Sequence, residues 1–575
     1  MIDLFNRKRF FDKRIRENLI LILIIISFNF LIFNLFLNSY NINDSHLIYA
    51  LDDPYIHMSI AKNLIKYGVW GINKYEFVSV SSSPFWTILL SIIYLIFGVK
   101  DYIPFVLNII IANLIIIYTY LILKKFKISN LLTFITLILI IFITPMPTLI
   151  FIGMEHLLHI FFILFFLKLF IEIFYSNQNI SSLKIYLFYI VNSILPLIRY
   201  ESLFLLPPLI IFLLYKRKIK FLINILIFIF VPIIIFGLIS KNYGGFFIPN
   251  SLILKNGINL ESLLKYIFLK NFKLIYRNKV IYFQILISFF ILIFYIMKTK
   301  EFFIKEVTIN FIFIILAIIH SILIRNEQLY RYDAYIVFIG LFSIFSSIEL
   351  LISIFIKIIF VSIKKIINSI KIDKKSTKFD FKNVLSLLLI IIFVSVFTNI
   401  VYENSKKIIY PFYFRATDSY KKIVVATNNI YKQQFQMAKF IKYFYNEEKI
   451  AINDIGAISY YTDVYIIDLV GLGNNELAKL KINKNYNSKN LLNILDREDI
   501  NLIIIYDSWF KNFIKDLNLD YIKVCEWKIN NNVVCGSDIV SFYVRREPEK
   551  IKTLIINLKN FCHLLPKDIS IKFFY

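Results

Sequence analysis

The sequence has few cysteines, and their spacing does not match a zinc site. The three cysteines are Cys525, Cys535 and Cys562, and no pair of them forms a metal-binding motif. The chain also has no segment typical of a cleavable signal peptide. The first apolar block, at about residues 19–37, is too long, and no small-residue cleavage site follows it. We therefore expect no zinc module, and we expect the first block to remain as a membrane anchor.

Acidic residues are scarce relative to basic ones. The chain has 38 Asp and Glu residues against 65 Lys and Arg residues, which gives a formal net charge of +27. Such a balance can indicate nucleic-acid binding, but no basic run is interleaved with a recognisable binding module. The positive clusters lie between apolar blocks, where such clusters set membrane orientation and meet anionic lipid. We therefore expect a membrane partner and no nucleic acid.

Long apolar blocks replace the mixed composition of a soluble protein. Hydrophobic residues make up 58% of the chain, against roughly 45–50% for an ordinary soluble chain. A helix of about 20 apolar residues crosses the hydrocarbon core of a bilayer. Apolar blocks fall near residues 19–37, 84–98, 103–123, 130–152, 157–175, 185–198, 202–215, 219–240, 280–297, 308–324, 333–363 and 384–402. The pattern predicts an α-helical protein that crosses the membrane many times.

The positive charges between these blocks predict the orientation, because Lys and Arg are favoured in cytoplasmic loops. Basic clusters lie at the N-terminus and at residues 124–127, 216–220, 298–305 and 357–382. Twelve full crossings would place 124–127 outside, whereas every cluster lies inside if the short block 84–98 does not cross. We therefore expect about 11 transmembrane helices in the cell membrane, with a cytoplasmic N-terminus. The alternative is that two of the separate blocks form one crossing.

A change of composition after residue 402 predicts three regions. Residues 1–402 would form the transmembrane domain, with a first extracytoplasmic loop at 38–83. Residues 403–548 would form an extracytoplasmic α/β domain, and 549–575 would form a tail. Helical spacing at 430–446 and 488–498 alternates there with strand-like runs at 450–453, 464–470 and 502–506.

Two extended segments of this domain, 521–528 and 533–545, flank Asn530–Asn532 and carry Cys525 and Cys535. In a hairpin the two cysteines could lie within disulfide range, and an outside location permits the bond. They could equally be two packed thiols, and the sequence leaves both interpretations open.

The first outside loop contains adjacent carboxylates, Asp52 and Asp53. Pro54 suits the first turn of a helix and Asp53 suits its N-cap, while Gly68 is a natural stop. Apolar residues recur at helical spacing between these ends, which predicts an amphipathic helix along the membrane surface. Asp53 could be only a cap and Asp52 only a solvated loop acid. However, two adjacent acids repel each other, and such a pair can hold a carboxylate as a base or metal ligand.

The fragment DDPYIHMSIAKNL, followed by SSSPFW at Ser81–Trp86, resembles the first extracytoplasmic loop of bacterial GT-C glycosyltransferases. The most similar group is usually written with D-D-A-Y and S-P-L-W and is related to mycobacterial arabinofuranosyltransferases. The wider superfamily includes protein O-mannosyltransferases and the aminoarabinose transferases that modify lipid A. The resemblance continues in order through Gly153–Glu155, Leu197–Glu201, Pro249–Ser251 with Lys255, Asn453–Ala457 and Asp468–Leu472.

The sequence departs from this pattern at two positions. Tyr200 stands where the group often has proline, and Ser251 stands where it often has threonine. These departures bear on the identity of the substrate more than on the class of reaction.

The resemblance implies a sugar donor on polyprenyl phosphate and an acceptor that is an envelope glycan, lipid or protein. Asp52 would be the base that takes the acceptor proton, and Asp53 would orient it or share a divalent cation, Mg²⁺ or Mn²⁺. The leaving phosphate gains charge, so cations aimed at it lower the barrier. A single in-line displacement would invert the anomeric carbon. The residues that would bind substrate are Glu155, Arg199, Glu201, Asn250, Lys255, Arg325 and Arg331.

Several of these residues also have plain structural interpretations. Arg199 and Glu201 could simply end two helices, and Lys255 could be an ordinary loop lysine. The runs at 325–327 and 331–333 could be local salt bridges, which contribute little when exposed. Asp454 and Asp468 are more typical of turn residues than of catalytic ones.

Three other functions compete with the transferase interpretation. A transporter or flippase often shows internal repeats and broken helices, but no repeat is visible and the acids lie beside the membrane. A lipid-linked glycan polymerase or ligase would place its key residues in a later outside loop, such as 241–278. In a non-catalytic scaffold, replacing Asp52 would have no effect on activity.

Overall fold

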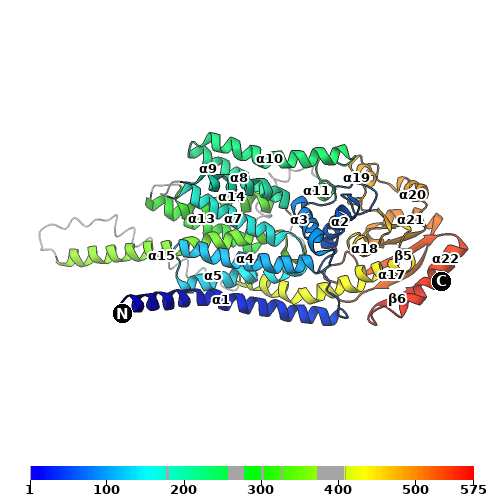
Figure 1. The fold of residues 1–575 in the computed structure, drawn as a ribbon, viewed down its shortest axis with the longest axis horizontal. Coiled ribbons are helices and arrows are strands. Elements are labelled where there is room, and N and C mark those ends of the chain that lie inside the picture. The colour runs from blue at the N-terminus through cyan, green and yellow to red at the C-terminus, as the bar shows by residue number, and fades with distance from the viewer. Residues whose placement is uncertain are drawn as a thin grey trace.

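The computed structural model describes residues 2–176, 180–256, 278–299, 303–324, 328–371, 407 and 409–575. A bundle of long helices forms one end of the molecule, and a smaller domain built on a β-sheet forms the other (Figure 1). The predicted crossing at 384–402 and the predicted boundary between 402 and 403 lie outside the described residues.

The helices of the bundle follow the charge-free apolar runs of the sequence. In lipid each backbone polar group must be satisfied within its own segment, which a helix achieves. The helical elements from the N-terminus are α1 (Ile2–Ile42), α2 (Asp53–Tyr67), α3 (Pro84–Phe97), α4 (Ile103–Lys125), α5 (Asn130–Ile143), α6 (Met146–Ile152), α7 (His156–Phe174), α8 (Ser182–Ile198), η1 (Tyr200–Leu205), α9 (Leu206–Tyr215), α10 (Ile219–Asn242), α11 (Asn250–Asn256), α13 (Lys279–Thr299), α14 (Lys305–Leu323), η2 (Gln328–Tyr330) and α15 (Ala334–Lys371).

Among the described residues, seven segments are long and apolar enough to cross a membrane, by length and composition. They are Asn18–Ile42, Ile103–Lys125, Asn130–Ile152, His156–Phe174, Ile219–Asn242, Lys279–Met297 and Lys305–Leu323. Shorter apolar helices cover Pro84–Phe97, Ser182–Ile198, Tyr200–Tyr215 and Ala334–Glu349. The protein is therefore a multi-pass α-helical membrane protein, as predicted, while the count of 11 crossings stays a prediction.

The sheet domain alternates strands and helices. Its elements are η3 (Tyr431–Phe435, a π-helical turn), α17 (Gln436–Phe444), β1 (Lys449–Ile452), α18 (Gly456–Tyr461), β2 (Tyr465–Asp468), α19 (Asn475–Ile482), α20 (Ser488–Arg497), β3 (Leu502–Ile505), η4 (Asp507–Trp509), α21 (Lys511–Asp520), β4 (Tyr521–Lys528), β5 (Ile539–Arg545), α22 (Pro548–Cys562) and β6 (Ser570–Phe573). The strand order is β2-β1-β3-β5-β4-β6. Strands β1, β2 and β3 are parallel, and the remaining pairs are antiparallel.

The predicted α/β domain is thus confirmed, and its sheet extends beyond the predicted limit. Residues 549–575, which the sequence analysis assigns to a tail, contain most of α22 and all of β6. Strand β6 pairs with β4. The Phe561 ring of α22 stacks on Trp527 of β4, with ring centroids 5.8 Å apart. Burial of these aromatic surfaces holds the C-terminal segment on the sheet.

Cys525 and Cys535 do not form a disulfide in this structure. Strand β5 begins at Ile539, so Cys535 lies in the loop before it, and Cys525 pairs with Phe542 of β5. Both thiols are free, and the Cys535 Sγ lies 3.4 Å from the Gln434 Oε1.

A helix through residues 409–430 connects the bundle to the sheet domain (Figure 1, yellow). Thr427 on this helix hydrogen-bonds to Ser39 of α1 at 2.8 Å. Arg415 forms a buried bidentate salt bridge with Asp333, in which each of the two N–O distances is 2.8 Å. Asp333 therefore does not form the local salt bridge with Arg331 that the sequence allowed.

Helix α2 lies between the bundle and the sheet domain (Figure 1). It ends at Gly68, as predicted, where a φ of +68° suits glycine. Residues Pro54 to Asn63 are all buried, so both faces of the helix lie against protein, and its position along the membrane surface stays a prediction. Its polar side chains find partners in the sheet domain. The Lys62 Nζ donates to the carbonyls of Ser459 and Tyr460 at 3.1 and 2.8 Å.

Candidate active site

The Asp52 carboxylate is bound to the start of helix α18. Its Oδ2 accepts from the Gly456 backbone N–H at 2.6 Å, and its Oδ1 accepts from the Ala457 N–H at 2.8 Å. A helix N-terminus carries free N–H groups and a partial positive charge, so it favours an anion. Asp52 is also the N-cap residue of α2 but makes no side-chain cap bond there. The prediction that Asp53 is the N-cap is therefore wrong, because Asp53 is the first helical residue.

Gly456 permits this close approach. A Cβ at residue 456 would lie 2.1 Å from the Asp52 carbonyl oxygen and 2.7 Å from its Oδ2. Nothing larger than hydrogen fits at this position without moving Asp52.

If Asp52 is the base that the sequence resemblance implies, Gly456→Ala is expected to displace its carboxylate and lower kcat by about 10- to 100-fold, because misplacing a reacting group by about 1 Å has effects of that size. The initial rate of the sugar transfer that the resemblance implies, measured beside the thermal unfolding midpoint, tests this. A normal rate in the folded variant would show that the position of Asp52 does not matter.

Two other carboxylates lie near Asp52. Burial and the neighbouring Asp454 carboxylate raise the pKa of Asp52 to about 8, and Asp53 adds to the effect. Asp454 accepts from the Tyr506 hydroxyl at 2.5 Å and from the Gln434 Nε2 at 2.7 Å. Burial and Asp53 raise the pKa of Asp454 as well. Sequence reasoning favoured a turn role for Asp454. The structure places it in an acidic cluster with residues some 400 positions away.

Asp53 points toward the bundle and pairs with Arg331. The Asp53 Oδ2 lies 2.7 Å from the Arg331 guanidinium, and the carboxylate is 32% exposed while the arginine is 4% exposed. The same guanidinium contacts the Met154 Sδ at 3.3 Å. Within the described part of the chain, the Arg331 Nε has no hydrogen-bond partner. A buried cation thus lies beside Asp53, the second of the two adjacent acids.

A second arginine belongs to the same polar region. Arg199 donates to the Glu155 Oε1 at 2.6 Å and to the Glu201 Oε1 at 2.5 Å. The guanidinium groups of Arg199 and Arg331 both lie over the Tyr332 ring, 5.1 and 4.8 Å from its centroid. Cation–π contact of this kind holds two like charges near one another. The structure therefore brings Glu155, Arg199, Glu201 and Arg331 together around Tyr332.

The local backbone explains the glycine that precedes Glu155. Gly153 ends α6 with a φ of +71°, and a Cβ there would lie 2.3 Å from the Tyr49 ring. This turn directs Glu155 into the buried region. The Glu155 Oε2 lies 3.8 Å from the His57 Nε2 of α2.

His57 is a residue that sequence reasoning missed. Its Nδ1 is 3.1 Å from the Thr87 hydroxyl and 3.1 Å from the Ser81 hydroxyl, so the DDPYIHM and SSSPFW fragments meet at this histidine. Its position in the helical fragment after the acid pair was the only signal in the sequence.

The remaining predicted residues lie elsewhere or outside the described part of the chain. Asn250 donates to the Leu472 carbonyl at 3.2 Å and to the Asn475 Oδ1 at 3.1 Å, which ties α11 to the sheet domain. The side chain of Lys255 and all of Arg325 are not among the described residues. Asp468 accepts from the Val470 and Gly473 N–H groups, as a turn residue does.

The carboxylates in this arrangement do not present a set of free oxygens to one metal ion. Both Asp52 oxygens accept backbone N–H groups, and Asp53 is paired with Arg331. The described residues hold no group of three or more His, Cys, Asp or Glu side chains placed to bind a metal. The Mg²⁺ or Mn²⁺ ion stays a prediction.

Comparison with solved structures identifies the fold. The chain is similar to ArnT from Cupriavidus metallidurans, in its crystal structure bound to undecaprenyl phosphate, with a TM-score of 0.50 and 11% sequence identity over 91% of this chain and 97% of that one. A second neighbour is the archaeal oligosaccharyltransferase AglB from Archaeoglobus fulgidus, in complex with an inhibitory peptide and a dolichol-phosphate. Its TM-score is 0.46, with 13% identity over 86% of this chain and 72% of that one. The protein has the fold of the GT-C glycosyltransferase superfamily, as the sequence fragments predicted.

Comparison with family models gives a match over part of the sheet domain. Residues 428–543 match a family model described as a domain of unknown function (DUF8728). The sequence matches no curated protein.

Proposed function

We propose that this protein transfers a sugar from a polyprenyl-phosphate carrier to an envelope glycan, lipid or protein at the outer face of the cell membrane. One observation carries the proposal. On a GT-C fold, the adjacent acids Asp52 and Asp53 lie where the bundle meets the sheet domain, and Arg331 pairs with Asp53 there. A lipid-linked donor requires no soluble nucleotide outside the cell, which suits the orientation predicted from the positive charges.

In the proposed reaction Asp52 takes the proton of the acceptor hydroxyl. Its raised pKa of about 8 makes it a stronger base than an ordinary carboxylate. The acceptor oxygen forms a bond to the anomeric carbon while the bond from that carbon to the phosphate oxygen breaks. The electron pair leaves with the polyprenyl phosphate. A single displacement from the opposite side inverts the anomeric configuration.

Arg331 stabilises the leaving phosphate in this proposal. Its buried guanidinium is already oriented by Asp53 and Tyr332, so little reorganisation accompanies the gain of negative charge. Arg199 lies over the same Tyr332 ring, and Glu155 and Glu201 hold it in place.

The pH dependence of this reaction gives a specific prediction. A base acts when deprotonated, so kcat/KM is expected to rise with pH and to level off above the Asp52 pKa of about 8. This rise is the acid limb of the profile. Asp454→Asn removes a neighbouring negative charge, which favours ionised Asp52 and lowers its pKa. We expect the acid limb to move to lower pH by about one unit. Matched rate profiles of wild type, Asp454→Asn and the surface control Asp496→Asn measure the shift.

An acid limb that stays in place in Asp454→Asn, or moves to higher pH, would contradict this assignment. The Asp496 side chain is 59% exposed and belongs to a surface pair with Arg545, so its variant should leave the profile unchanged.

The reaction itself is tested with protein purified in detergent. A panel of polyprenyl-phosphate sugars is supplied with a crude envelope extract, and release of polyprenyl phosphate is measured with the anomeric configuration of the product. Release that depends on the extract, with inversion, is the expected result. Sugar-independent lipid binding without any release would favour a transporter instead.

A further inference from the structure

The turn that carries Arg331 has an unfavourable backbone conformation. Leu329 and Tyr330, the two residues before Arg331, have φ values of +58° and +59°. A Cβ makes this left-handed region costly, and residues other than glycine enter it mostly one at a time. Two of them in succession persist only where surrounding contacts impose the conformation. The contacts around this turn are therefore the reason that Arg331 lies where it does.

The first of these contacts comes from the helix through residues 409–430. The Tyr330 hydroxyl donates to the Asp418 Oδ2 at 2.8 Å. Lys422, one turn further along this helix, lies 2.9 Å from the same oxygen. Side chains four residues apart are neighbours on one helix face, so Lys422 orients the carboxylate that accepts from Tyr330. The hydroxyl thus binds an acceptor that is already oriented by its own helix.

Arg415, on the same helix, binds the turn on both sides of Arg331. Its guanidinium donates to both carboxylate oxygens of Asp333 at 2.8 Å, and to the Tyr330 carbonyl at 3.4 Å. It also lies over the Tyr330 ring, 4.7 Å from the ring centroid. The residue before Arg331 and the residue two positions after it are thus both fixed to one helix.

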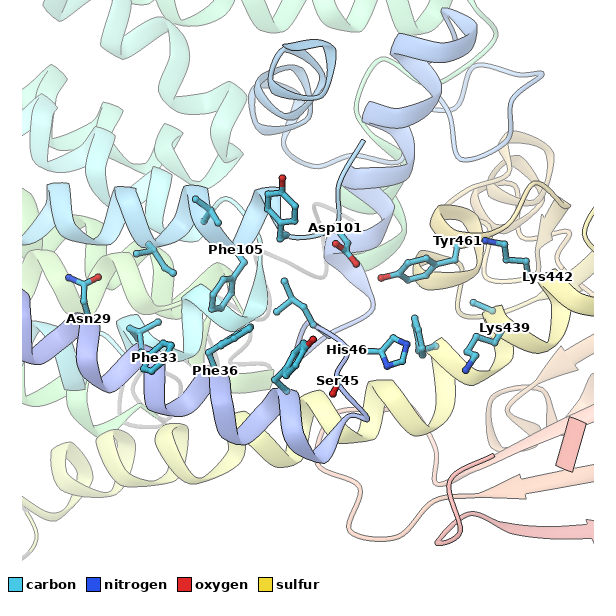
Figure 2. Close-up of a pocket in the computed structure, with 18 of the residues that line it drawn as sticks. Asn29, Phe33, Phe36, Ser45, His46, Asp101, Phe105, Lys439, Lys442 and Tyr461 are labelled. Atoms are coloured by element: carbon cyan, nitrogen blue, oxygen red, sulfur yellow. The ribbon is translucent and has the colours of Figure 1, made fainter. Parts of the chain in front are cut away.

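This helix is itself held in place by the bundle. It continues through η3 into α17 without a break, and Thr427 hydrogen-bonds to Ser39 of α1. Further along, Phe435 and Lys439 line a groove of about 1030 Å³ together with residues of α1 and α4 (Figure 2). The helix therefore meets the bundle at several points along its length and gives Tyr330 a fixed support.

The position of Arg331 decides what its charge can do. The contribution of a group to catalysis falls by up to about 10²-fold when the group is displaced by about 1 Å. An arginine side chain has several rotatable bonds, so its charge reaches a defined point only if its backbone is fixed. Within the described residues the Arg331 Nε has no hydrogen-bond partner, so side-chain contacts alone fix the guanidinium incompletely.

We propose that Tyr330 and Asp418 are positioning residues for Arg331, because their hydrogen bond keeps the turn in the conformation that directs the guanidinium toward the leaving phosphate. This inference rests on the proposed function. Both residues act through Arg331 and not on the substrate. The helix that carries Asp418 also leads to the sheet domain, whose α18 binds the Asp52 carboxylate. One helix thus connects the supports of the base and of the leaving-group cation.

Tyr330→Phe removes the hydroxyl and leaves the ring that Arg415 covers. We expect kcat for release of polyprenyl phosphate to fall about tenfold, and the KM for the donor to stay within about twofold, because a displaced Arg331 loses contact mainly with the transition state. Tyr431→Phe is the matched control, since the Tyr431 hydroxyl also donates to an aspartate, the Asp44 Oδ2, at 2.6 Å. Its kcat should equal that of wild type. An unchanged kcat in Tyr330→Phe would overturn the proposal.

A double-mutant cycle with Arg331→Gln separates positioning from a general effect on the fold. If Tyr330 acts through Arg331, Tyr330→Phe should have no further effect on kcat in the Arg331→Gln protein. A hydroxyl that only stabilises the fold would lower kcat by the same factor in both backgrounds, and this result would overturn the proposal.

Variants of Asp418 test the hydrogen bond from its other side, and they apply even if Tyr330→Phe does not fold. Asp418→Asn keeps an oxygen that can accept from Tyr330, so it should retain most of the wild-type kcat. Asp418→Ala should lose about as much as Tyr330→Phe. Equal losses in the two Asp418 variants would show that the hydrogen bond is not the cause, and would overturn the proposal.

Failure of the positioning role and failure of the proposed function give different results. A wild-type protein that transfers no sugar would refute the proposed function, and the positioning role with it. Normal transfer by wild type, with unchanged kcat in Tyr330→Phe and Asp418→Ala, would refute the positioning role alone.

Discussion

Asp52→Asn is expected to lower kcat for sugar transfer by about 10²- to 10⁴-fold, which is the usual contribution of a general base. The asparagine keeps the size of the side chain and can still accept one backbone N–H group from α18. It loses the ability to take the acceptor proton at any pH in the assay. Release of polyprenyl phosphate under saturating donor measures the effect, with Asp496→Asn as the matched surface control.

The Asp52→Asn result has meaning only if the variant is folded and binds the donor lipid. We expect a donor affinity within a few-fold of wild type, because the carboxylate acts on the acceptor hydroxyl. A variant that binds donor normally and turns over at the wild-type rate would move the base to another carboxylate of the cluster, Asp53 or Asp454.

Arg331→Gln is expected to lower kcat by about 10²- to 10³-fold, the range found when one donor to a developing anion is removed. The arginine is 4% exposed and is the ion-pair partner of Asp53, so its loss also leaves that carboxylate without its cation. The expected signature is a fall in kcat with little change in KM, because the phosphate gains charge mainly in the transition state.

Arg331→Lys serves as the conservative variant, since it keeps a positive charge but loses the planar guanidinium over Tyr332. It should recover part of the lost rate. Arg546→Gln, at an exposed surface position of the sheet domain, should behave as wild type. A rise in KM with unchanged kcat in Arg331→Gln would show that Arg331 only binds substrate and does not stabilise the leaving group.

Much of the fold follows from patterns that are local in the sequence. Charge-free apolar runs predict membrane helices, and β-branched runs predict the strands that become β1, β2 and β3. Pro54 and Gly68 mark the ends of α2. Proline suits the first turn and glycine suits the positive φ at the C-cap, and both effects depend only on the nearby backbone. The order of short fragments from residue 52 to 472 predicted the GT-C fold.

The site depends on contacts that no local pattern contains. The Asp52 carboxylate binds Gly456, 404 residues away in the chain. The sequence therefore suggested an ordinary loop acid or a base but could not indicate a bond to α18. Arg331 has an acid two residues later, yet it pairs with Asp53, while Asp333 pairs with Arg415. Local charge spacing cannot distinguish these pairings.

The surroundings of the polar face of α2 could not be predicted for a related reason. An alternation of apolar and polar residues describes a helix with one face in water or headgroups. The polar face of α2 is instead covered by α18, whose carbonyls accept from Lys62. Burial lowers the pKa of this lysine to about 8. The polar side chains of α2 thus bind another part of the same chain.

The most direct test of the account measures donor binding and turnover on one preparation of wild type and Asp52→Asn. Both proteins are expected to bind a polyprenyl-phosphate sugar with similar affinity, and only wild type is expected to release polyprenyl phosphate when envelope extract is added. Equal release by both proteins, or binding without release by wild type for every sugar in the panel, would contradict it.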